Sequence, residues 1–347
     1  MQRDFHFYAT MVLARAAGFN DKDAWIIATS SQYVDDSTEH LPIYIKVNGD
    51  MLIFDPTCTS YSKINPASLD WTNQKRVWIP FHFLPGHLFR PNKSLHFSYL
   101  TIPNSAFGQF LLQQAIYEPL SNYKHRLVRI GVATHTFADS FSHAGFSGRH
   151  SRSENDVKHF SLWKNGQWDE SIIRKTFLNI SPQIGHAEAR SYPDYSSRKW
   201  RCELGEPSRE IERDNVLTFL KAAKAIYLCF FEIRRLNSEN LISWEELEPS
   251  LKSLFEIKND LDLEGKCEEW RKKFAYIFPV GSDLFFYGKE KLRKDALEGD
   301  TNWDGFSKKD WLKEPIRKSK SNFSRSLWFL FHKAALHQRH LVLERIP

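Results

Sequence analysis

Hydrophobic residues recur at helical spacing from the start of the chain. Residues 4–17 follow this spacing up to a glycine, which predicts a first helix. A second helix is predicted to begin at Asn20 or Asp21, either of which can cap it, and to end at Asp35 and Asp36. Two carboxylates at the negative end of a helix dipole are unfavourable without compensation. A bound cation would supply that compensation.

The pattern changes to alternation over residues 43–54. β-Branched residues flank Asn48-Gly49 there, which predicts a β-hairpin. Residues 76–84 and 95–102 are apolar and bounded by prolines, and we expect them to be extended or irregular. Residues 146–205 are rich in Ser, Arg, Gly and Pro and are expected to be mostly loop. Helical spacing predicts further helices at about residues 105–118, 124–144, 209–236, from Ser243 onwards, and 321–346.

These elements together predict a mainly α fold. It would contain a helical metal-site domain with a small N-terminal β-hairpin, followed by a C-terminal helical region. We place the metal-binding domain at residues 1–240. The basic, aromatic-rich C-terminal region covers residues 241–347 and either packs on the first domain or stands apart from it.

Composition agrees with a globular protein. Of the 347 residues, 41% are hydrophobic and 26% are charged, and 27 Phe and 11 Trp provide material for a thick core. No apolar run approaches the roughly 20 residues that a membrane-spanning helix needs. The four cysteines form no CxxC pair, and the N-terminal segment lacks the long apolar stretch of a secretion signal. We therefore expect a cytoplasmic protein.

Positive charge is concentrated near the C-terminus. Residues 305–347 hold ten Lys and Arg against three Asp and Glu. The predicted helix at 321–346 combines aromatic residues such as Trp328 and Phe331 with basic ones such as Lys333. Such a helix packs on the core or lies on an anionic membrane. No nucleic-acid-binding motif accompanies the charge.

The strongest chemical signal lies in residues 131–148. His135, Asp139 and His143 are spaced four residues apart, so they share one face of a helix whose neighbouring residues are apolar. Imidazole, carboxylate and imidazole on one stripe form half of a coordination shell for zinc, iron or manganese. The alternative is a buried hydrogen-bond network without a metal.

Further candidate ligands recur through the first 200 residues. This wider group consists of His6, Asp35, Asp36, His82, His87, His186, Glu188 and Asp194. His82 lies in an aromatic, Pro-rich segment that can hold an imidazole rigidly, and His6 lies one turn into the first helix, where it can face inward.

Several motifs resemble those of a bacterial family of unknown function. They are QYVDD (32–36), PFHFLPG (80–86), HTFADSFSHAGFSG (135–148) and GHAEARSYPD (185–194), and the similarity covers roughly residues 4–225.

More distantly, the order of candidate ligands resembles the zinc-dependent phospholipase C and P1-type nuclease superfamily, whose members are all-α enzymes with clustered zinc. The resemblance implies His6 as the first ligand, Asp35 or Asp36 as the carboxylate and His82 as the next histidine. It also implies His135, Asp139 and His143 from one helix, closed by His186 and Glu188. That superfamily uses a processed N-terminal amino group as a ligand, whereas this chain starts with Met1 and shows no signal. Its final pair is also spaced HxxxE rather than HxE. One or two metal ions are expected, most simply zinc.

These residues favour a metal-dependent hydrolase of phosphoesters that acts through a metal-activated water. One of Asp35 and Asp36 would bind metal and the other would act as general base, and Arg149 would hold a phosphate. The expected substrate is a small-molecule or lipid phosphoester. The alternatives are a non-haem di-iron oxidase or oxygenase and a non-enzymatic protein with a structural metal. No HExxH, GxSxG, GxxxxGK or GxGxxG motif is present, which argues against the enzyme classes that those motifs mark.

Overall fold

The computed structural model describes residues 1–47, 49–61, 69–88, 98–119, 122–170, 183–234, 241–257, 262–277, 283–299, 301 and 316–347. The fold is a mixed α+β one, with 54% of the described residues in helices and 15% in strands. Within these residues, two sheets, of three and four strands, flank the helices. The prediction of a mainly α fold with one small hairpin is therefore wrong.

The helices and strands follow one another along the chain as follows. The N-terminal part holds η1 (Asp4–Ala9), α1 (Thr10–Ala16), α2 (Asp21–Asp36), β1 (Ile43–Val47), β2 (Asp50–Phe54), α3 (Trp71–Asn73), η3 (Gln74–Trp78), α4 (Ile79–Phe81), α5 (Ala106–Tyr117) and α6 (Tyr123–Ser142). The middle holds α7 (Arg152–Asn155), β3 (Val157–Lys164), β4 (Gln167–Asp169), η4 (Tyr192–Asp194), β5 (Lys199–Leu204), β6 (Arg209–Asp214) and α9 (Asn215–Arg234). The C-terminal part holds α10 (Trp244–Phe255), α11 (Leu263–Lys273), η5 (Asp283–Phe285), α12 (Lys289–Ala296), β7 (Ile316–Lys318), η6 (Phe323–Arg325) and α14 (Leu327–Leu343).

The four-stranded sheet, in the order β4-β3-β5-β6, accounts for much of the error in fold class. It occupies the part of the chain that was expected to be loop and the start of the helix expected at 209–236. Strand β5 alternates half-buried and buried residues without a break, and β6 pairs with it over its whole length. This alternation is the mark of a half-buried strand. The many Gly, Ser and Arg residues around it obscured that signal.

Residues 76–84 also differ from the prediction. They form the end of η3 and the short helix α4 rather than extended chain. Pro80 is the second residue of α4, which continues η3 without a break in helical backbone. The predicted helices at 4–17 and 105–118, the second helix capped by Asn20, and the capping box at Ser243 are confirmed.

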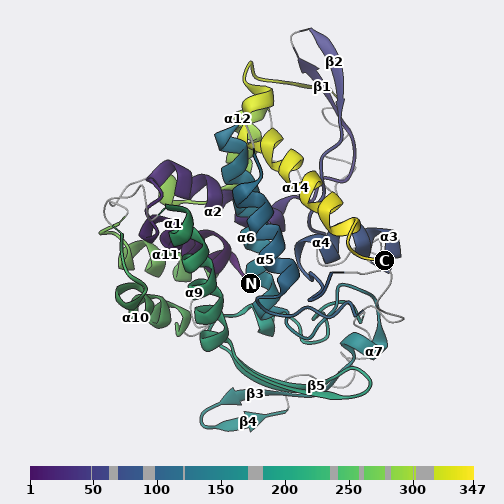
Figure 1. Cartoon of the computed structure of the whole chain (residues 1–347), viewed down its shortest axis with the longest axis vertical. Coiled ribbons are helices and arrows are strands. Elements are labelled where there is room, and N and C mark those ends of the chain that lie inside the picture. The colour runs from purple at the N-terminus through teal and green to yellow at the C-terminus, as the bar shows by residue number, and fades with distance from the viewer. Residues whose placement is uncertain are drawn as a thin grey trace.

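Helix α6 runs through the middle of the molecule, with α2, α5, α9 and α14 packed around it (Figure 1). It approaches α2 closely at Gly131, where an added Cβ would lie 2.3 Å from the carbonyl oxygen of Ile27. The main hydrophobic core includes Phe5 and Ile27 from the N-terminal helices, Phe137 from α6 and Trp328 from the C-terminal helix. This packing brings the N-terminal helices, α6 and the C-terminal helix into one core.

The three-stranded sheet lies at the opposite end of the molecule from the four-stranded one (Figure 1). Its hairpin of β1 and β2 forms at the predicted position, and β7 pairs with β1 in parallel, with Tyr44 opposite Ile316. On the inner face, Ile43 and Ile45 join the main core.

Helix α14 packs its apolar face against the core. Trp328 and Phe331 are fully buried, and the side-chain amide of Gln338 donates to Thr136 Oγ1 on α6. Among the described residues, no helix has both the length and the apolar character needed to cross a membrane.

Candidate metal centre

Side chains from five parts of the chain meet beside the C-terminal half of α6. His6 comes from η1, Asp35 from the end of α2, and His82 follows α4. Helix α6 contributes His135 and Asp139. Beyond it lie His143, His186 and Asp194, of which the last belongs to η4. Within the described residues these side chains form three adjoining groups that could hold a metal ion: His6, Asp35 and His135; His82, His135 and Asp139; and His143, His186 and Asp194.

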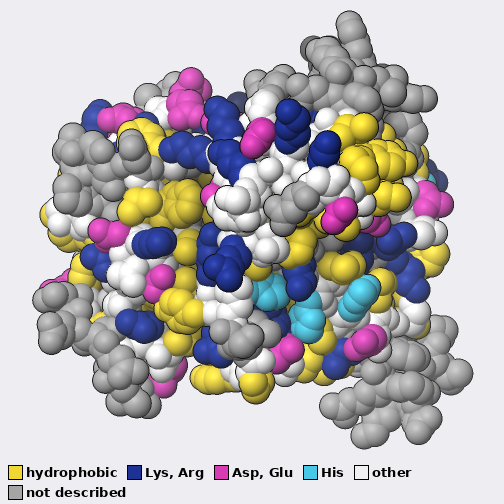
Figure 2. Space-filling view, turned by 90° about the horizontal axis from the view of Figure 1, so that it is seen from above, with side chains coloured by type: hydrophobic (Ala, Val, Ile, Leu, Met, Phe, Trp, Pro, Cys, Tyr) yellow, Lys and Arg dark blue, Asp and Glu magenta, His cyan; other side chains and the backbone are white. Residues whose placement is uncertain are grey.

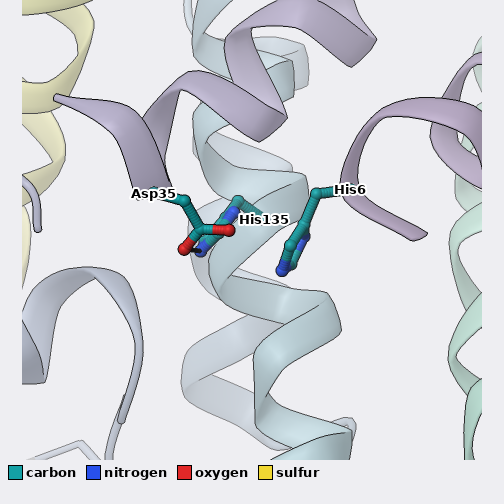
Figure 3. A group of neighbouring side chains, drawn as sticks. All are labelled: His6, Asp35 and His135. Atoms are coloured by element: carbon teal, nitrogen blue, oxygen red, sulfur yellow. Dashed lines mark ion pairs between the residues drawn. The ribbon is translucent and has the colours of Figure 1, made fainter. Parts of the chain in front are cut away.

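In the first group, three elements each contribute one side chain, and the three point toward one another (Figure 3). The rings of His6 and His135 stack with centroids 3.8 Å apart, and Asp35 Oδ1 lies 3.7 Å from His135 Nε2. His6 is completely buried, yet neither of its ring nitrogens makes a hydrogen bond within the described structure. Its Nε2 does lie 3.1 Å from Asp139 Oδ1, but its Nδ1 faces no partner among the described residues. A buried imidazole without a well-formed hydrogen bond is a costly arrangement that a metal ion would resolve.

Asp139 is central to the second group. Its two carboxylate oxygens lie 3.1 Å from His6 Nε2, 3.1 Å from His82 Nδ1 and 3.2 Å from His135 Nε2. Only 1% of Asp139 is exposed. Ligand atoms around one tetrahedral zinc ion stand about 3.3 Å apart, as bonds of about 2.0–2.1 Å require. The spacing of these atoms therefore fits a shared cation.

Four of the histidines are oriented by main-chain carbonyl groups. One ring nitrogen of His82 lies 2.9 Å from the carbonyl oxygen of Thr59, and one of His135 lies 2.9 Å from that of Ser31. In the same way, His143 is held by His82 and His186 by Arg190. Because a carbonyl only accepts hydrogen bonds, the nitrogen that faces it must carry the proton. In a neutral ring the other nitrogen then presents a lone pair to the carboxylates, as in metal-binding histidines.

The environment keeps the key imidazole neutral. Burial, together with the neighbouring His6, lowers the pKa of His135 well below its ordinary value. Although burial alone favours the protonated acid, His143 and the amino group of Met1 hold the pKa of Asp139 well below its ordinary value. A lone pair of His135 and a carboxylate oxygen of Asp139 therefore face each other with no proton between them. Such a contact is unfavourable unless positive charge lies near both atoms. A bound cation would supply it, as would a protonated His82, whose Nδ1 lies 3.1 Å from Asp139 Oδ2 and 3.3 Å from His135 Nε2.

The α-amino group of Met1 supplies positive charge to the cluster. It donates to Asp139 Oδ1 at 2.7 Å and to Asp194 Oδ1 at 3.0 Å. Although burial opposes its charge, the carboxylates of Asp139, Asp194 and Asp35 raise the pKa of this amino group to about 11. An ammonium group held between two carboxylates marks a position that favours a cation.

The third group contains a residue that the predicted ligand set omitted. Asp194 Oδ1 lies 2.9 Å from His143 Nε2, and Asp194 Oδ2 lies 3.2 Å from His186 Nε2. Its position at the end of the GHAEARSYPD segment was the available signal. The choice between Glu188 and Asp194 as the partner of His186 could not be made from spacing alone.

Glu188 forms hydrogen bonds to the neighbouring chain segments rather than to the clustered histidines. Its carboxylate accepts the main-chain N–H of Val157 at 2.8 Å and the side-chain amide of Gln183 at 3.1 Å. It belongs to none of the three groups found among the described residues. These contacts hold the segment that carries His186 against β3.

Asp36 and Arg149 also lie apart from the three groups. Asp36 Oδ2 accepts hydrogen bonds from Tyr287 Oη at 2.7 Å and from Gln32 Nε2 at 3.1 Å. The guanidinium group of Arg149 lies over the rings of Tyr99 and Trp71, at 4.8 and 5.5 Å from their centroids.

A cavity of about 500 Å³ adjoins the first group. Asp35 and Asp36 lie on its wall together with Arg3, Tyr287 and Lys289. Burial, with Asp139 contributing, raises the pKa of Asp35 to about 8, although 32% of its side chain remains exposed. The cavity is within the size range of small-molecule sites. A ligand there would meet one candidate metal ligand and the neighbouring carboxylate.

Neither a search of curated proteins nor one of solved structures found a match. The model of a family of unknown function, DUF6765, matches residues 1–346, so the chain belongs to that family.

Proposed function

We propose that this protein is a metal-dependent hydrolase that cleaves phosphoester bonds. The observation that carries the proposal is the array of carbonyl-anchored histidines whose free nitrogens converge on Asp35, Asp139 and Asp194. Imidazole and carboxylate ligands in closely spaced groups suit zinc best, with iron or manganese as alternatives. One or two ions would occupy the groups centred on Asp139.

The residues of the chain would have different roles in this reaction. His6, His82, His135, Asp35 and Asp139 would hold metal, which when bound acidifies a coordinated water and stabilises charge on a phosphoryl oxygen. Asp36 lies next to the ligand Asp35, and Tyr287 and Gln32 orient one of its oxygens. It would take up the proton of the attacking water as general base.

The cavity supports an enzymatic role over a purely structural metal. A structural site is closed by protein ligands, whereas a catalytic site keeps a position for water or substrate. Asp35 borders a cavity of about 500 Å³. Substrate could therefore reach the group of His6, Asp35 and His135 from this side.

The order of ligands also supports a relationship with the zinc-dependent phospholipase C and P1-type nuclease superfamily. The sequence departs from that superfamily at the N-terminal amino group. In the structure, however, the amino group of Met1 lies between Asp139 and Asp194. The HxE spacing of His186 and Glu188 is a departure that the contacts of Glu188 explain, because Glu188 bonds to the main chain and Asp194 meets His186.

Metal analysis tests the proposal. Protein purified without chelator is expected to contain one or two zinc, manganese or iron ions per chain and to hydrolyse bis(p-nitrophenyl) phosphate. H135A and D139N should lose both the metal and the activity, whereas H340A, which alters an exposed histidine of α14, should keep both. Protein that folds and binds no metal, even after incubation with zinc, would contradict the proposal. Iron with visible absorption and no hydrolysis would favour the oxidase alternative.

A further inference from the structure

The outer face of the three-stranded sheet carries apolar residues that no other part of the described structure covers. Tyr44 on β1 lies directly opposite Ile53 on β2 and Ile316 on β7. Because opposite residues in a ladder share a face, these three side chains form a row across the sheet. Their exposed fractions are 47%, 63% and 56%.

A second row on the same face adds positive charge. Lys46 is two residues from Tyr44 and therefore points to the same side. It lies opposite Met51, which is 51% exposed, and opposite Lys318. Both lysines are exposed, and neither forms an ion pair with another described residue.

The strands place no acidic residue on this face. Asp50 is the single acidic residue within β1, β2 and β7, and it lies opposite Val47, on the inner side. The outer face, defined here as Tyr44, Lys46, Met51, Ile53, Ile316 and Lys318, is thus apolar and cationic. In space-filling view, this end of the molecule shows hydrophobic side chains with Lys and Arg, and also some Asp and Glu, around them (Figure 2).

We propose that this outer face docks on an anionic lipid bilayer. Its apolar row would enter the interfacial region, and Lys46 and Lys318 would meet lipid phosphate or carboxylate groups. Charge complementarity selects this partner over a second copy of the chain, because two copies of the face would bring four lysines together. The exposed Glu298, whose main-chain N–H donates to the carbonyl oxygen of Lys318, adds one carboxylate per copy beside them and forms no ion pair with either lysine. The hairpin also projects from the body of the molecule, so the face can reach a flat surface (Figure 1).

Vesicle sedimentation with the full chain tests it. The protein is expected to sediment with vesicles containing about 30% phosphatidylserine but not with pure phosphatidylcholine vesicles. About 0.5 M salt should release it from the anionic vesicles. The double variant I53E/I316E should abolish binding. K46Q/K318Q, which keeps the apolar row, should weaken it about tenfold or more, because each basic residue near such a surface adds roughly 1 kcal/mol.

A matched control distinguishes vesicle binding through the outer face from nonspecific hydrophobic binding. Leu217 and Leu228 on α9 are 52% and 49% exposed, so L217E/L228E changes similar side chains elsewhere and should bind vesicles as the unmodified protein does. Circular dichroism would verify folding, and K46Q/K318Q keeps the test open if I53E/I316E does not fold. Absence of binding to anionic vesicles would overturn the proposal, as would equal binding by the outer-face variants and the control. A dimer that I53E alone dissociates, without vesicle binding, would assign the face to a second copy instead.

Discussion

At the scale of single residues, the two adjacent aspartates at the end of α2 differ sharply in their surroundings. Asp35 Oδ1 lies 3.7 Å from His135 Nε2 and 3.9 Å from His82 Nδ1. Asp36 instead accepts hydrogen bonds from Tyr287 and Gln32 at the wall of the cavity. Neighbours in sequence point in different directions on a helix, about 100° apart. One carboxylate can therefore bind metal while the other faces a substrate.

This difference leads to a prediction for conservative substitutions. D35N should lower the metal content of the purified protein. D36N should keep the metal and reduce the turnover of bis(p-nitrophenyl) phosphate by about 10²–10⁴-fold, as expected for loss of a general base. Metal analysis and initial rates measured on the same samples provide the comparison. If D36N loses metal as D35N does, the proposed division of roles is wrong.

At the scale of elements, the metal centre depends on how closely α2 and α6 approach. His135 lies on α6 and Asp35 on α2, and the Nδ1 of His135 also meets the carbonyl oxygen of Ser31 on α2. Gly131 allows this approach, because its missing side chain leaves room for the backbone of α2. Any shift between the two helices would move two ligands and an orienting contact together.

A side chain at Gly131 should separate these helices. In G131A the new Cβ would lie 2.3 Å from Ile27 O and 2.7 Å from Ser30 Cβ, so the helices must move apart. Although alanine favours helix, overpacking of this kind costs about 1–3 kcal/mol, and we expect a lower free energy of unfolding and weaker zinc binding.

Gly108 on α5 provides the matched control. Its added Cβ would meet the edge of the Phe137 ring at 3.1 Å, and a ring edge yields more easily than a backbone. G108A should therefore be less destabilising and should leave zinc affinity unchanged, as urea unfolding and zinc titration would measure. Equal effects of the two variants would argue against a special role for the α2–α6 contact.

At the scale of the whole molecule, buried polar contacts connect the N-terminal half to the C-terminal helices. The guanidinium group of Arg293 on α12 pairs with Glu39 at 2.6 Å, and both side chains are almost completely buried. On α14, His332 Nδ1 accepts the main-chain N–H of Thr57 at 3.0 Å. Burial of a charge or an imidazole is tolerated here because each has a partner from a distant part of the chain.

His332 should make the stability of the protein depend on pH. Burial lowers its pKa from 6.5 to about 4. Between these values the unfolded chain binds a proton that the folded chain does not. The contribution of His332 is therefore complete above pH 6.5 and decreases as the pH falls toward 4, by about 1.4 kcal/mol per pH unit. Urea unfolding at several pH values would measure this decrease.

Other buried histidines add to the same trend, so a variant must isolate the part due to His332. H332N keeps an acceptor for the N–H of Thr57 but has no group that titrates in this range. The difference in free energy of unfolding between the unmodified protein and H332N should shrink or reverse as the pH falls from 6.5 to 4. A difference that stays constant over this range would show that His332 does not contribute.

The sequence by itself determined much of the helical framework and several members of the candidate site. The helical spacing of apolar residues, the caps at Asn20 and Ser243 and the hairpin before Phe54 are all present in the structure. The stripe of His135, Asp139 and His143 was also visible. These features depend on residues a few positions apart, whose interactions are local to one helix or one turn.

Only the tertiary structure decided what depends on contacts between distant segments. It paired β7 with β1 in parallel and assembled β3, β5 and β6 into a sheet. It placed Asp194 rather than Glu188 against His186, and separated Asp36 from Asp35. A strand forms where a partner strand satisfies its backbone hydrogen bonds. Which side chain a carboxylate contacts depends on how the surrounding elements pack. Neither condition can be read from the neighbours of a residue along the chain.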